Sequence, residues 1–229
     1  MTKTEAARGR PRDASAAQEA ILDAAEAVFA EHGFDGARVD AIATSSGYNK
    51  GLIYHYFGDK LGLYTAVLGR ADEQSSHLAL QLFGLLSSND AMTAGTFRLF
   101  LERACAAGFD YFAAHPRILR ILAWEEAEGW TTLVKVYRQF DQSDKKRLLA
   151  TFDQAQRAGV LRPAVSPQLF FHFVYNVCRS YLTSIPLLQL TGLGEGLSTP
   201  DALAQVREQI VALIVHGLVA DPTSDAAET

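Results

Sequence analysis

One short stretch, residues 38–60, constrains the fold of this 229-residue chain more than any other. Apolar residues recur at helical spacing up to Ile42, and the helix breaker Ser46-Gly47 follows. A second apolar helical pattern then begins at Ile53. Two short helices joined by a tight turn that contains glycine are the sequence form of a helix-turn-helix. In that motif the second helix enters the major groove of DNA, and its N-terminal residues reach base edges.

The second helix of this pattern has an inward face and an outward face. Ile53 and Phe57 point inward, so the opposite face is the one available to a ligand. That face carries Lys50, Tyr54 and His55, a mixture of hydrogen-bond donors and aromatic rings that suits nucleic acid. The alternative interpretation is an aromatic helix buried in a core, because aromatic stripes commonly pack inside proteins.

The same residues resemble a motif that closes the DNA-binding domain of TetR/AcrR-type regulators. The motif has the form Ile-Ala-x-x-x-Gly-x-x-x-Gly-x-Leu/Ile-Tyr-x-His/Tyr-Phe-x-x-Lys, and the chain matches it from Ile42 to Lys60. The resemblance implies an all-α protein with an N-terminal three-helix domain and a larger helical domain for effector binding and dimerisation. It also implies a sequence-specific transcriptional regulator, a repressor that a small-molecule effector releases from DNA.

The resemblance, together with the helical pattern, gives a set of residues expected to contact DNA. They are Arg38, Ser45, Asn49, Lys50, Gly51, Leu52, Tyr54, His55, Tyr56 and Lys60. The resemblance assigns base-facing positions to Lys50, Gly51, Leu52 and His55, and phosphate-facing positions to Tyr54, Tyr56 and Lys60. Family members usually have Ser or Thr as the cap of the first motif helix. This chain has Ala37-Arg38 instead, which leaves Arg38 available to a phosphate.

Composition limits how the chain can bind DNA. Its formal net charge is -5 and its pI is about 5.7, so it is not a nonspecific binder of polyanions. DNA binding must therefore come from local geometry. The N-terminal arm has a local basic excess, with Lys3, Arg8, Arg10 and Arg12. Such an arm can follow phosphates or enter a minor groove, and a disordered solubilising tail is the alternative.

Helical apolar periods continue through the rest of the chain, and no alternating strand pattern interrupts them. Ser15 predicts the start of a first helix and Gly33 its end, with an acidic outer face of Glu19, Asp23 and Glu26 turned to solvent. Further helices are expected over residues 60–86, 92–114, 116–128, 130–158, 167–190 and 200–219. The expected domains are 1–60 for DNA binding, 61–220 for effector binding and dimerisation, and 221–229 as a disordered tail.

The last two expected helices are the best candidates for a homodimer interface. Both are apolar on more sides than one small domain can easily cover, and twofold symmetry matches a palindromic operator in double-stranded DNA. The expected interface comprises Phe173, Val177, Tyr181, Leu203, Val206, Ile210, Leu213, Ile214 and Gly217. The alternative is the core of an ordinary monomer.

Residues of the expected C-terminal domain also suggest an effector pocket, because aromatic side chains there are mixed with a few polar groups. The candidates are Arg103, Trp124, Trp130, Tyr137, Asn176 and Arg179. Each of them could instead serve packing or an interface. A DNA-binding regulator controlled by a protein partner is a second possible function, and a helical enzyme or ligand carrier that keeps the motif as scaffold is a third.

The sequence contains no visible catalytic or metal-binding constellation. Cys105 and Cys178 lie far apart within apolar helical patterns, which excludes a CxxC site and favours two small core residues. We therefore expect no enzyme activity, catalytic residue, metal or cofactor. No apolar run reaches the ~18 residues of a membrane span, so a cytoplasmic protein without membrane contact is expected.

Overall fold

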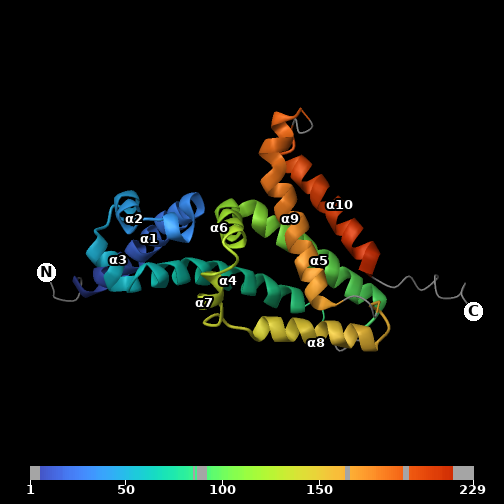
Figure 1. Cartoon of the computed structure of the whole chain (residues 1–229). Helices are drawn as coiled ribbons and strands as arrows, with labels where there is room; N and C mark the ends of the chain where they lie inside the picture. The colour runs from blue at the N-terminus through green and yellow to red at the C-terminus, as the bar shows by residue number, and fades with distance from the viewer. Residues whose placement is uncertain (1–5, 85, 87–91, 163–165, 193–195, 219–229) are drawn as a thin grey trace, which may run out of the picture. The chain divides into compact units, whose positions relative to one another are not determined.

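The computed structural model describes residues 6–84, 86, 92–162, 166–192 and 196–218, and the side chains of those among them from residue 14 to residue 216 (Figure 1). Within these residues the elements are ten α-helices, which confirms the all-α prediction. They are α1 (Ala6–Gly36), α2 (Val39–Ser46), α3 (Lys50–Phe57), α4 (Lys60–Gly84), α5 (Ala94–Ala114), α6 (Pro116–Ala127), α7 (Leu133–Tyr137), α8 (Ser143–Arg157), α9 (Pro167–Leu190) and α10 (Pro200–Leu218). None of these described helices is long and apolar enough to span a lipid bilayer.

The chain divides into two compact units. The first unit comprises Met1–Glu73 and Pro116–Phe140, and the second comprises Gln74–His115 and Asp141–Thr229. The first unit thus combines α1, α2, α3 and the start of α4 with α6 and α7. From sequence we had placed α6 and α7 in the domain that follows residue 60, whereas α6 packs along α1.

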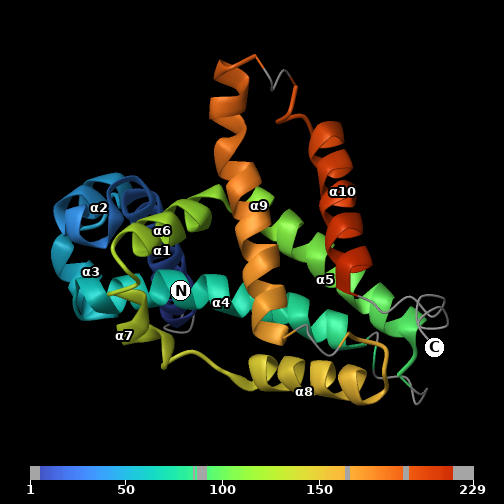
Figure 2. The same ribbon diagram turned by 45° about the vertical axis from the view of Figure 1, so that its right-hand side comes forward.

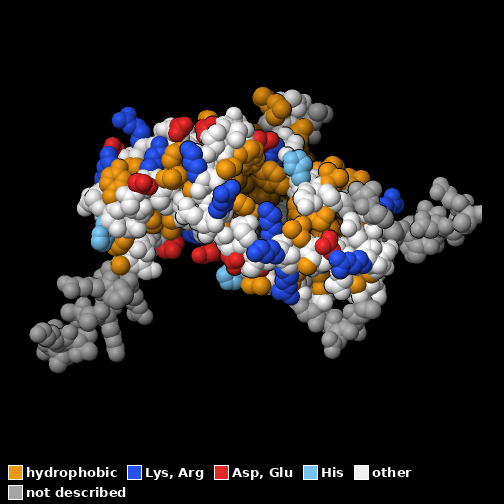
Figure 3. All heavy atoms as spheres, turned by 60° about the horizontal axis from the view of Figure 1, so that its bottom comes forward, with side chains coloured by type: hydrophobic (Ala, Val, Ile, Leu, Met, Phe, Trp, Pro, Cys, Tyr) orange, Lys and Arg blue, Asp and Glu red, His pale blue; other side chains and the backbone are white. Residues whose placement is uncertain are grey.

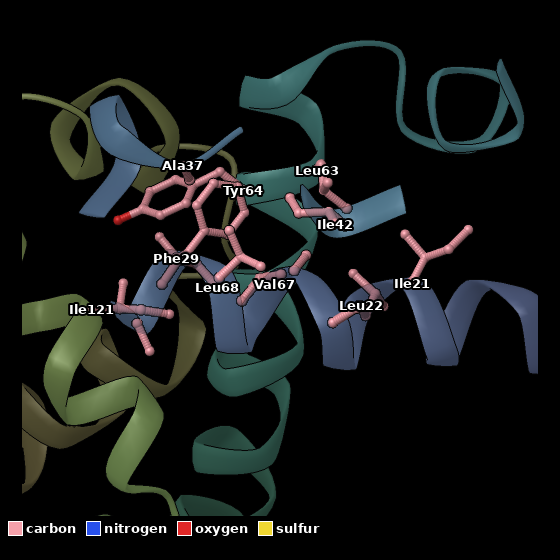
Figure 4. Packing of buried hydrophobic residues seen from close by; sticks show 14 of the residues in the cluster. Ile21, Leu22, Phe29, Ala37, Ile42, Leu63, Tyr64, Val67, Leu68 and Ile121 are labelled. Carbon is pink, nitrogen blue, oxygen red and sulfur yellow. The ribbon is translucent and has the colours of Figure 1, made fainter. Parts of the chain in front are cut away.

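Apolar side chains from α1, α2, α3, α4, α6 and α7 meet in the core of the first unit, part of which is seen in Figure 4. The side chains labelled there are Ile21, Leu22, Phe29, Ala37, Ile42, Leu63, Tyr64, Val67, Leu68 and Ile121. The ring of Phe29 meets the ring of Tyr64 edge to face, with 4.9 Å between the ring centroids. Because α2 contributes Ile42 and α4 contributes Tyr64, this core holds the helices that flank the predicted recognition helix.

Helix α1 differs from the sequence prediction at its start. It starts at Ala6 rather than at Ser15, and it passes through a kink at Gly33, where φ is 68° and ψ is -179°. The indole of Trp124 on α6 lies against this kink, so that a Cβ atom added at Gly33 would approach within 3.1 Å of the ring. The indole N–H of Trp124 also donates to the backbone oxygen of Ala30, at 3.3 Å. The non-helical backbone at Gly33 therefore ends the first helical segment of α1, as predicted, at the place where α6 docks.

The prediction of one long helix over residues 130–158 is wrong, because two helices, α7 and α8, occupy this range. Asp141 interrupts the helical pattern, since its carboxylate accepts from the backbone N–H of Ser143 at 2.9 Å and from its hydroxyl at 2.7 Å. Such local side-chain bonds compete with helix continuation. The hydrogen bonds from Ser143 lower the pKa of Asp141, which keeps the carboxylate charged and accepting.

The second unit is held by an aromatic core between α5, α8, α9 and α10, together with the end of α4. Helices α9 and α10 form an antiparallel pair beside α5 (Figure 2). The rings of Phe97, Phe152 and Phe170 are almost fully buried and in contact. Both cysteines lie in this core, and burial raises the pKa of the Cys105 thiol to about 12 and that of Cys178 to about 11. Their place confirms the prediction of two core residues.

Candidate nucleic-acid interface

The backbone from α2 to α3 has the form of a helix-turn-helix. Gly47 takes the left-handed conformation, with φ at 76°, and its N–H donates to the backbone oxygen of Ala43 to close α2. Asn49 then caps α3, because its side-chain oxygen accepts from the N–H of Leu52 at 2.8 Å. Ile53 is 1% exposed and anchors α3 in the core of the first unit. The turn and the anchor together fix which face of α3 is outward.

That outward face carries most of the side chains expected to contact DNA. The exposed members of the set are Arg38, Ser45, Asn49, Lys50, Gly51, Tyr54 and His55, and the half-buried members are Leu52, Tyr56 and Lys60. The side chain of Arg38 makes no cap bond to α2, which agrees with the loss of the usual Ser or Thr at this place. Asn49 has a structural task as well, because its oxygen is engaged by the cap.

Two expected phosphate contacts are also structural contacts within the first unit. Lys60 donates to the backbone oxygen of Asp35 at 3.2 Å, and its ammonium lies 4.7 Å from the ring centroid of Phe34. These bonds tie the start of α4 to the end of α1. Tyr56 packs against the core of the unit and next to the ring of Phe57. Both side chains thus help to place α3, independently of any contact with phosphate.

Lys50, at the first turn of α3, has an acidic neighbour that we did not foresee. Its ammonium lies 3.1 Å from a carboxylate oxygen of Asp40, in the first turn of α2, and 5.9 Å from the ring centroid of Tyr54. The hydrogen bond to Asp40 raises the pKa of Lys50, so the ammonium stays charged. In sequence the only signal was an acid ten residues before the lysine, across the turn.

A charged network ties α1 to α4 within the first unit. Arg70 on α4 pairs with Asp23 at 2.6 Å, with Glu26 at 2.7 Å and with Glu19 at 3.2 Å. Burial disfavours the guanidinium charge, but the hydrogen bonds to Asp23 and Glu26 prevail and raise the pKa of Arg70. Glu19 and Asp23 face solvent as expected, at 63% and 67% exposed, whereas Glu26 is 16% exposed and does not. No local pattern revealed the network, because Arg70 lies more than 40 residues along the chain from its partners.

A buried carboxylate joins α4, α6 and the start of α7. Glu125 is 1% exposed, and it accepts from the hydroxyl of Tyr64 at 2.6 Å and from the N–H of Leu133 at 2.9 Å. Burial, followed by the hydrogen bond to Glu125, raises the pKa of Tyr64 far above its ordinary value. The hydroxyl, drawn in red in Figure 4, points away from the labelled apolar side chains. Tyr64 is thus both a core residue and a polar link to α6.

The residues expected to bind an effector fall into two groups. Trp124, Trp130 and Tyr137 belong to the first unit, where Trp124 is engaged with α1. Trp130 follows α6 in the left-handed region, with φ at 65°, an unusual conformation for a residue with a side chain. The others, Arg103, Asn176 and Arg179, belong to the second unit, and the guanidinium of Arg179 donates to Asn176 at 3.3 Å. The six residues expected to bind an effector are therefore divided between the two units and do not form one site within either of them.

Two hollows of the second unit are open to solvent. The larger, with a volume of about 550 Å³, runs along one face of α9 and is lined by Phe173, Asn176, Val177 and Tyr181, among others. The smaller, of about 250 Å³, lies between Phe83, Met92 and α8. The larger hollow contains an effector candidate, Asn176, and the α9 residues expected at a dimer interface.

The residues expected at a dimer interface differ in exposure. Phe173 on α9 is 55% exposed and Leu213 on α10 is 78% exposed, whereas Ile210 and Ile214 are buried in the core of the second unit. Val177, Tyr181, Leu203 and Val206 are half-buried. For Gly217 the structure gives the helical backbone alone. Leu213 and Phe173 are therefore accessible to a partner, whereas Ile210 and Ile214 pack in the core of the second unit.

Charge at the surface is dispersed over the face seen in Figure 3. Lys and Arg side chains lie there among apolar and acidic ones, and they do not merge into one basic field. This agrees with the net charge of -5 and with DNA binding through local geometry.

Comparison with known proteins matches both parts of the chain. The model of the bacterial regulatory proteins of the tetR family matches residues 21–67, and that of the tetracyclin repressor-like C-terminal domain matches residues 104–214. The chain is 31% identical over 193 residues to the HTH-type transcriptional repressor SCO4008 of Streptomyces coelicolor, covering 84% of this chain and 91% of the relative. It is 44% identical over 213 residues to the HTH-type transcriptional regulator RutR of Escherichia coli O157:H7, covering 91% and 93%.

A solved structure has the same fold. The TetR family transcription regulator from Marinobacter aquaeolei superposes with a TM-score of 0.67, at 22% sequence identity, over 93% of this chain and 100% of that one. At this identity the likeness concerns the fold.

Proposed function

The chain belongs to the TetR family of bacterial regulatory proteins, and from this premise we propose that it is a sequence-specific repressor whose α3 reads the major groove of an operator. The observation that carries the proposal is the geometry of α3. Asn49 caps its first turn, Ile53 anchors its inner face, and Lys50, Tyr54 and His55 are left outward. The first turn of a recognition helix is the part that reaches base edges.

Phosphate contacts supply the affinity that the overall charge of the chain does not. Arg38, just before α2, is an exposed cation on the motif, and the half-buried Lys60 begins α4. Contacts of this kind release counterions, so affinity falls steeply as salt concentration rises. We propose that the N-terminal arm adds to them through Arg8, Arg10 and Arg12, whose side chains lie outside the described part of the chain, as does Lys3.

Selection from a random duplex library tests this function. We expect the purified protein to enrich one palindromic sequence, with half-sites about one helical turn or a small multiple apart. Binding to the enriched duplex should weaken steeply with added salt, and a scrambled duplex of equal composition serves as the control. Enrichment of no sequence, with equal affinity for both duplexes, would contradict the proposal.

We propose that the repressor acts as a homodimer through the outer faces of α9 and α10. These faces expose Phe173 and Leu213, large apolar side chains whose burial against a second copy is favourable. Two recognition helices related by a twofold axis match the symmetry of a palindrome.

Leu213→Glu is expected to convert the dimer into a folded monomer. The change places a carboxylate in the interface, where its charge has no partner, and it touches little of the core of the second unit because Leu213 is 78% exposed. Light scattering measures the mass, and circular dichroism checks that the fold persists. Val134→Glu, at an apolar residue that is 64% exposed in the first unit, is the matched control and should stay dimeric. A dimeric Leu213→Glu protein would place the interface elsewhere.

Release by a small molecule is the second half of the proposal. We propose that the effector enters the helical region after residue 60, where Asn176 and Arg179 form a polar pair beside aromatic side chains. Effector binding would then favour one spacing of the two recognition helices over another. We propose that both operator binding and release by the effector take place in the cytoplasm, where the operator is.

A further inference from the structure

Asp40 is an unexpected residue beside a surface that must approach DNA. Its carboxylate oxygens lie 3.1 and 3.2 Å from the ammonium of Lys50. The side chains of both residues are open to solvent, at 66% exposed for Asp40 and 44% for Lys50. The carboxylate comes from the first turn of α2 and the ammonium from the first turn of α3, so the pair spans the two helices of the motif.

Folding stability does not explain this placement. An ion pair between two exposed side chains contributes little to stability, because water screens it and holding both side chains in one geometry costs entropy. Affinity for the DNA backbone does not explain it either, since a carboxylate beside Lys50 repels phosphates and offsets the charge that attracts them. A role in reading bases remains, because there an acceptor is as useful as a donor.

The base edges of a G·C pair offer the complement of this ion pair. In the major groove, guanine presents two acceptors, N7 and O6, and the paired cytosine presents the N4 amino donor next to them. Lysine donates to the guanine acceptors, and aspartate accepts from cytosine N4. The ammonium of Lys50 and the carboxylate of Asp40 lie at hydrogen-bond distance from each other. Guanine O6 and cytosine N4 are likewise hydrogen-bonded to each other in the base pair, so the two spacings match.

We propose that Asp40 and Lys50 together read one G·C base pair in each half-site, Lys50 donating to the guanine and Asp40 accepting from the paired cytosine. The proposal rests on the function proposed above, since it requires α3 in the major groove. Asp40 is then a specificity-determining residue on α2, outside the recognition helix.

An A·T pair fits the same two groups less well. Its order across the groove is the N7 acceptor, the N6 donor, the O4 acceptor and a methyl group. An ammonium that donates to N7 of adenine lies beside the N6 amino group, which is also a donor. A carboxylate that accepts from N6 lies beside the O4 acceptor of thymine. Each group therefore meets one repulsive neighbour, which gives Asp40 and Lys50 a joint preference for G·C.

Measured affinities for a set of duplexes test the proposal. The set contains the duplex enriched by the wild-type protein and every single base-pair substitution of one half-site. The proteins are wild type, Lys50→Ala, Asp40→Ala and Asp40→Asn, with Asp35→Asn as a control that removes an exposed carboxylate of α1. Thermal melting without DNA confirms that each variant is folded.

The wild-type protein should discriminate one G·C pair by about 5- to 150-fold, the range of a good bidentate base contact. Lys50→Ala and Asp40→Ala should each reduce discrimination at that same pair and leave the other positions unchanged. Asp40→Asn should reduce it too, because the amide brings a donor towards the cytosine amino group. Asp35→Asn should leave the whole profile unchanged.

A different pattern overturns the proposal. If Asp40→Ala raises affinity for all duplexes alike and keeps every preference, Asp40 acts only as a charge that repels phosphate. If Asp40→Ala and Lys50→Ala affect different base pairs, the two residues do not act together. If the wild-type protein prefers no sequence, the proposed function fails first, which the library selection reveals before any variant is made.

Discussion

Phe29→Ala is expected to lower the free energy of unfolding by about 3 to 5 kcal/mol, the cost of removing a buried aromatic ring and leaving a cavity. The side chain of Phe29 is 0% exposed in the core of the first unit. Its ring packs edge to face on Tyr64 and lies beside Phe34, so the change loosens the contact of α1 with α4. Because the same core holds α2, the motif should lose its support together with α1.

Urea denaturation measures this cost. Val134→Ala is the matched control, since Val134 is 64% exposed in the same unit and its truncation should change the free energy of unfolding by less than about 0.5 kcal/mol. A loss below about 1 kcal/mol for Phe29→Ala would mean that this core does not hold α1 against α4.

Tyr64→Phe is expected to cost about 1.5 to 3 kcal/mol, the usual value of a hydrogen bond to a charged group. The change removes the hydroxyl that donates to Glu125 at 2.6 Å and keeps the ring that packs on Phe29. A nearly fully buried carboxylate then loses one of its donors, with Leu133 still donating to its other oxygen. Urea denaturation at pH 7 measures the difference, and Tyr54→Phe, with an exposed ring, should change little.

The effect of Tyr64→Phe should also depend on pH. Burial and the hydrogen bond to Glu125 raise the pKa of Tyr64 in the folded chain above its ordinary value of 10. The unfolded chain therefore loses this proton first as pH rises. The stability that Tyr64 contributes is fully present below pH 10 and declines above it, so the gap between wild type and Tyr64→Phe should narrow there. A gap of constant size from pH 7 to pH 11 would contradict this account.

Local signals were sufficient to predict the motif. A left-handed turn needed the glycine at 47, and the apolar spacing placed Ile53 inward. Each of these requirements involves neighbours within a few residues, so the sequence shows them directly. The structure confirms the helix-turn-helix, because Gly47 is left-handed and Ile53 is buried.

Interactions between distant segments were not predictable in the same way. Trp124 and Glu125 gave no hint that one docks on α1 and the other joins Tyr64, because their partners lie about sixty or more residues away. Arg70 and its carboxylates are a similar case. Residues 116–140 belong to the first compact unit, whereas their helical pattern alone groups them with the segment after residue 60.

The C-terminal helices show a different limit of sequence patterns. The apolar stripe of α10 includes Ile210 and Leu213, and a pattern does not tell which of the two faces the chain itself and which faces a partner. The structure separates them, since Ile210 is 7% exposed and Leu213 is 78% exposed. An Ile210→Glu variant would therefore damage the core of the second unit, and Leu213→Glu is the informative change.

The claim that α3 reads bases in the major groove is tested most directly by comparing Lys50→Ala with Tyr54→Phe on every base-pair substitution of the enriched duplex. Lys50→Ala should change which bases are tolerated at one position, because it removes a donor from the first turn of the recognition helix. Tyr54→Phe should weaken all duplexes by a similar factor and keep every preference, because it removes a hydroxyl expected to bind phosphate. The opposite result, an unchanged preference for Lys50→Ala and an altered one for Tyr54→Phe, would contradict this orientation of α3 on DNA.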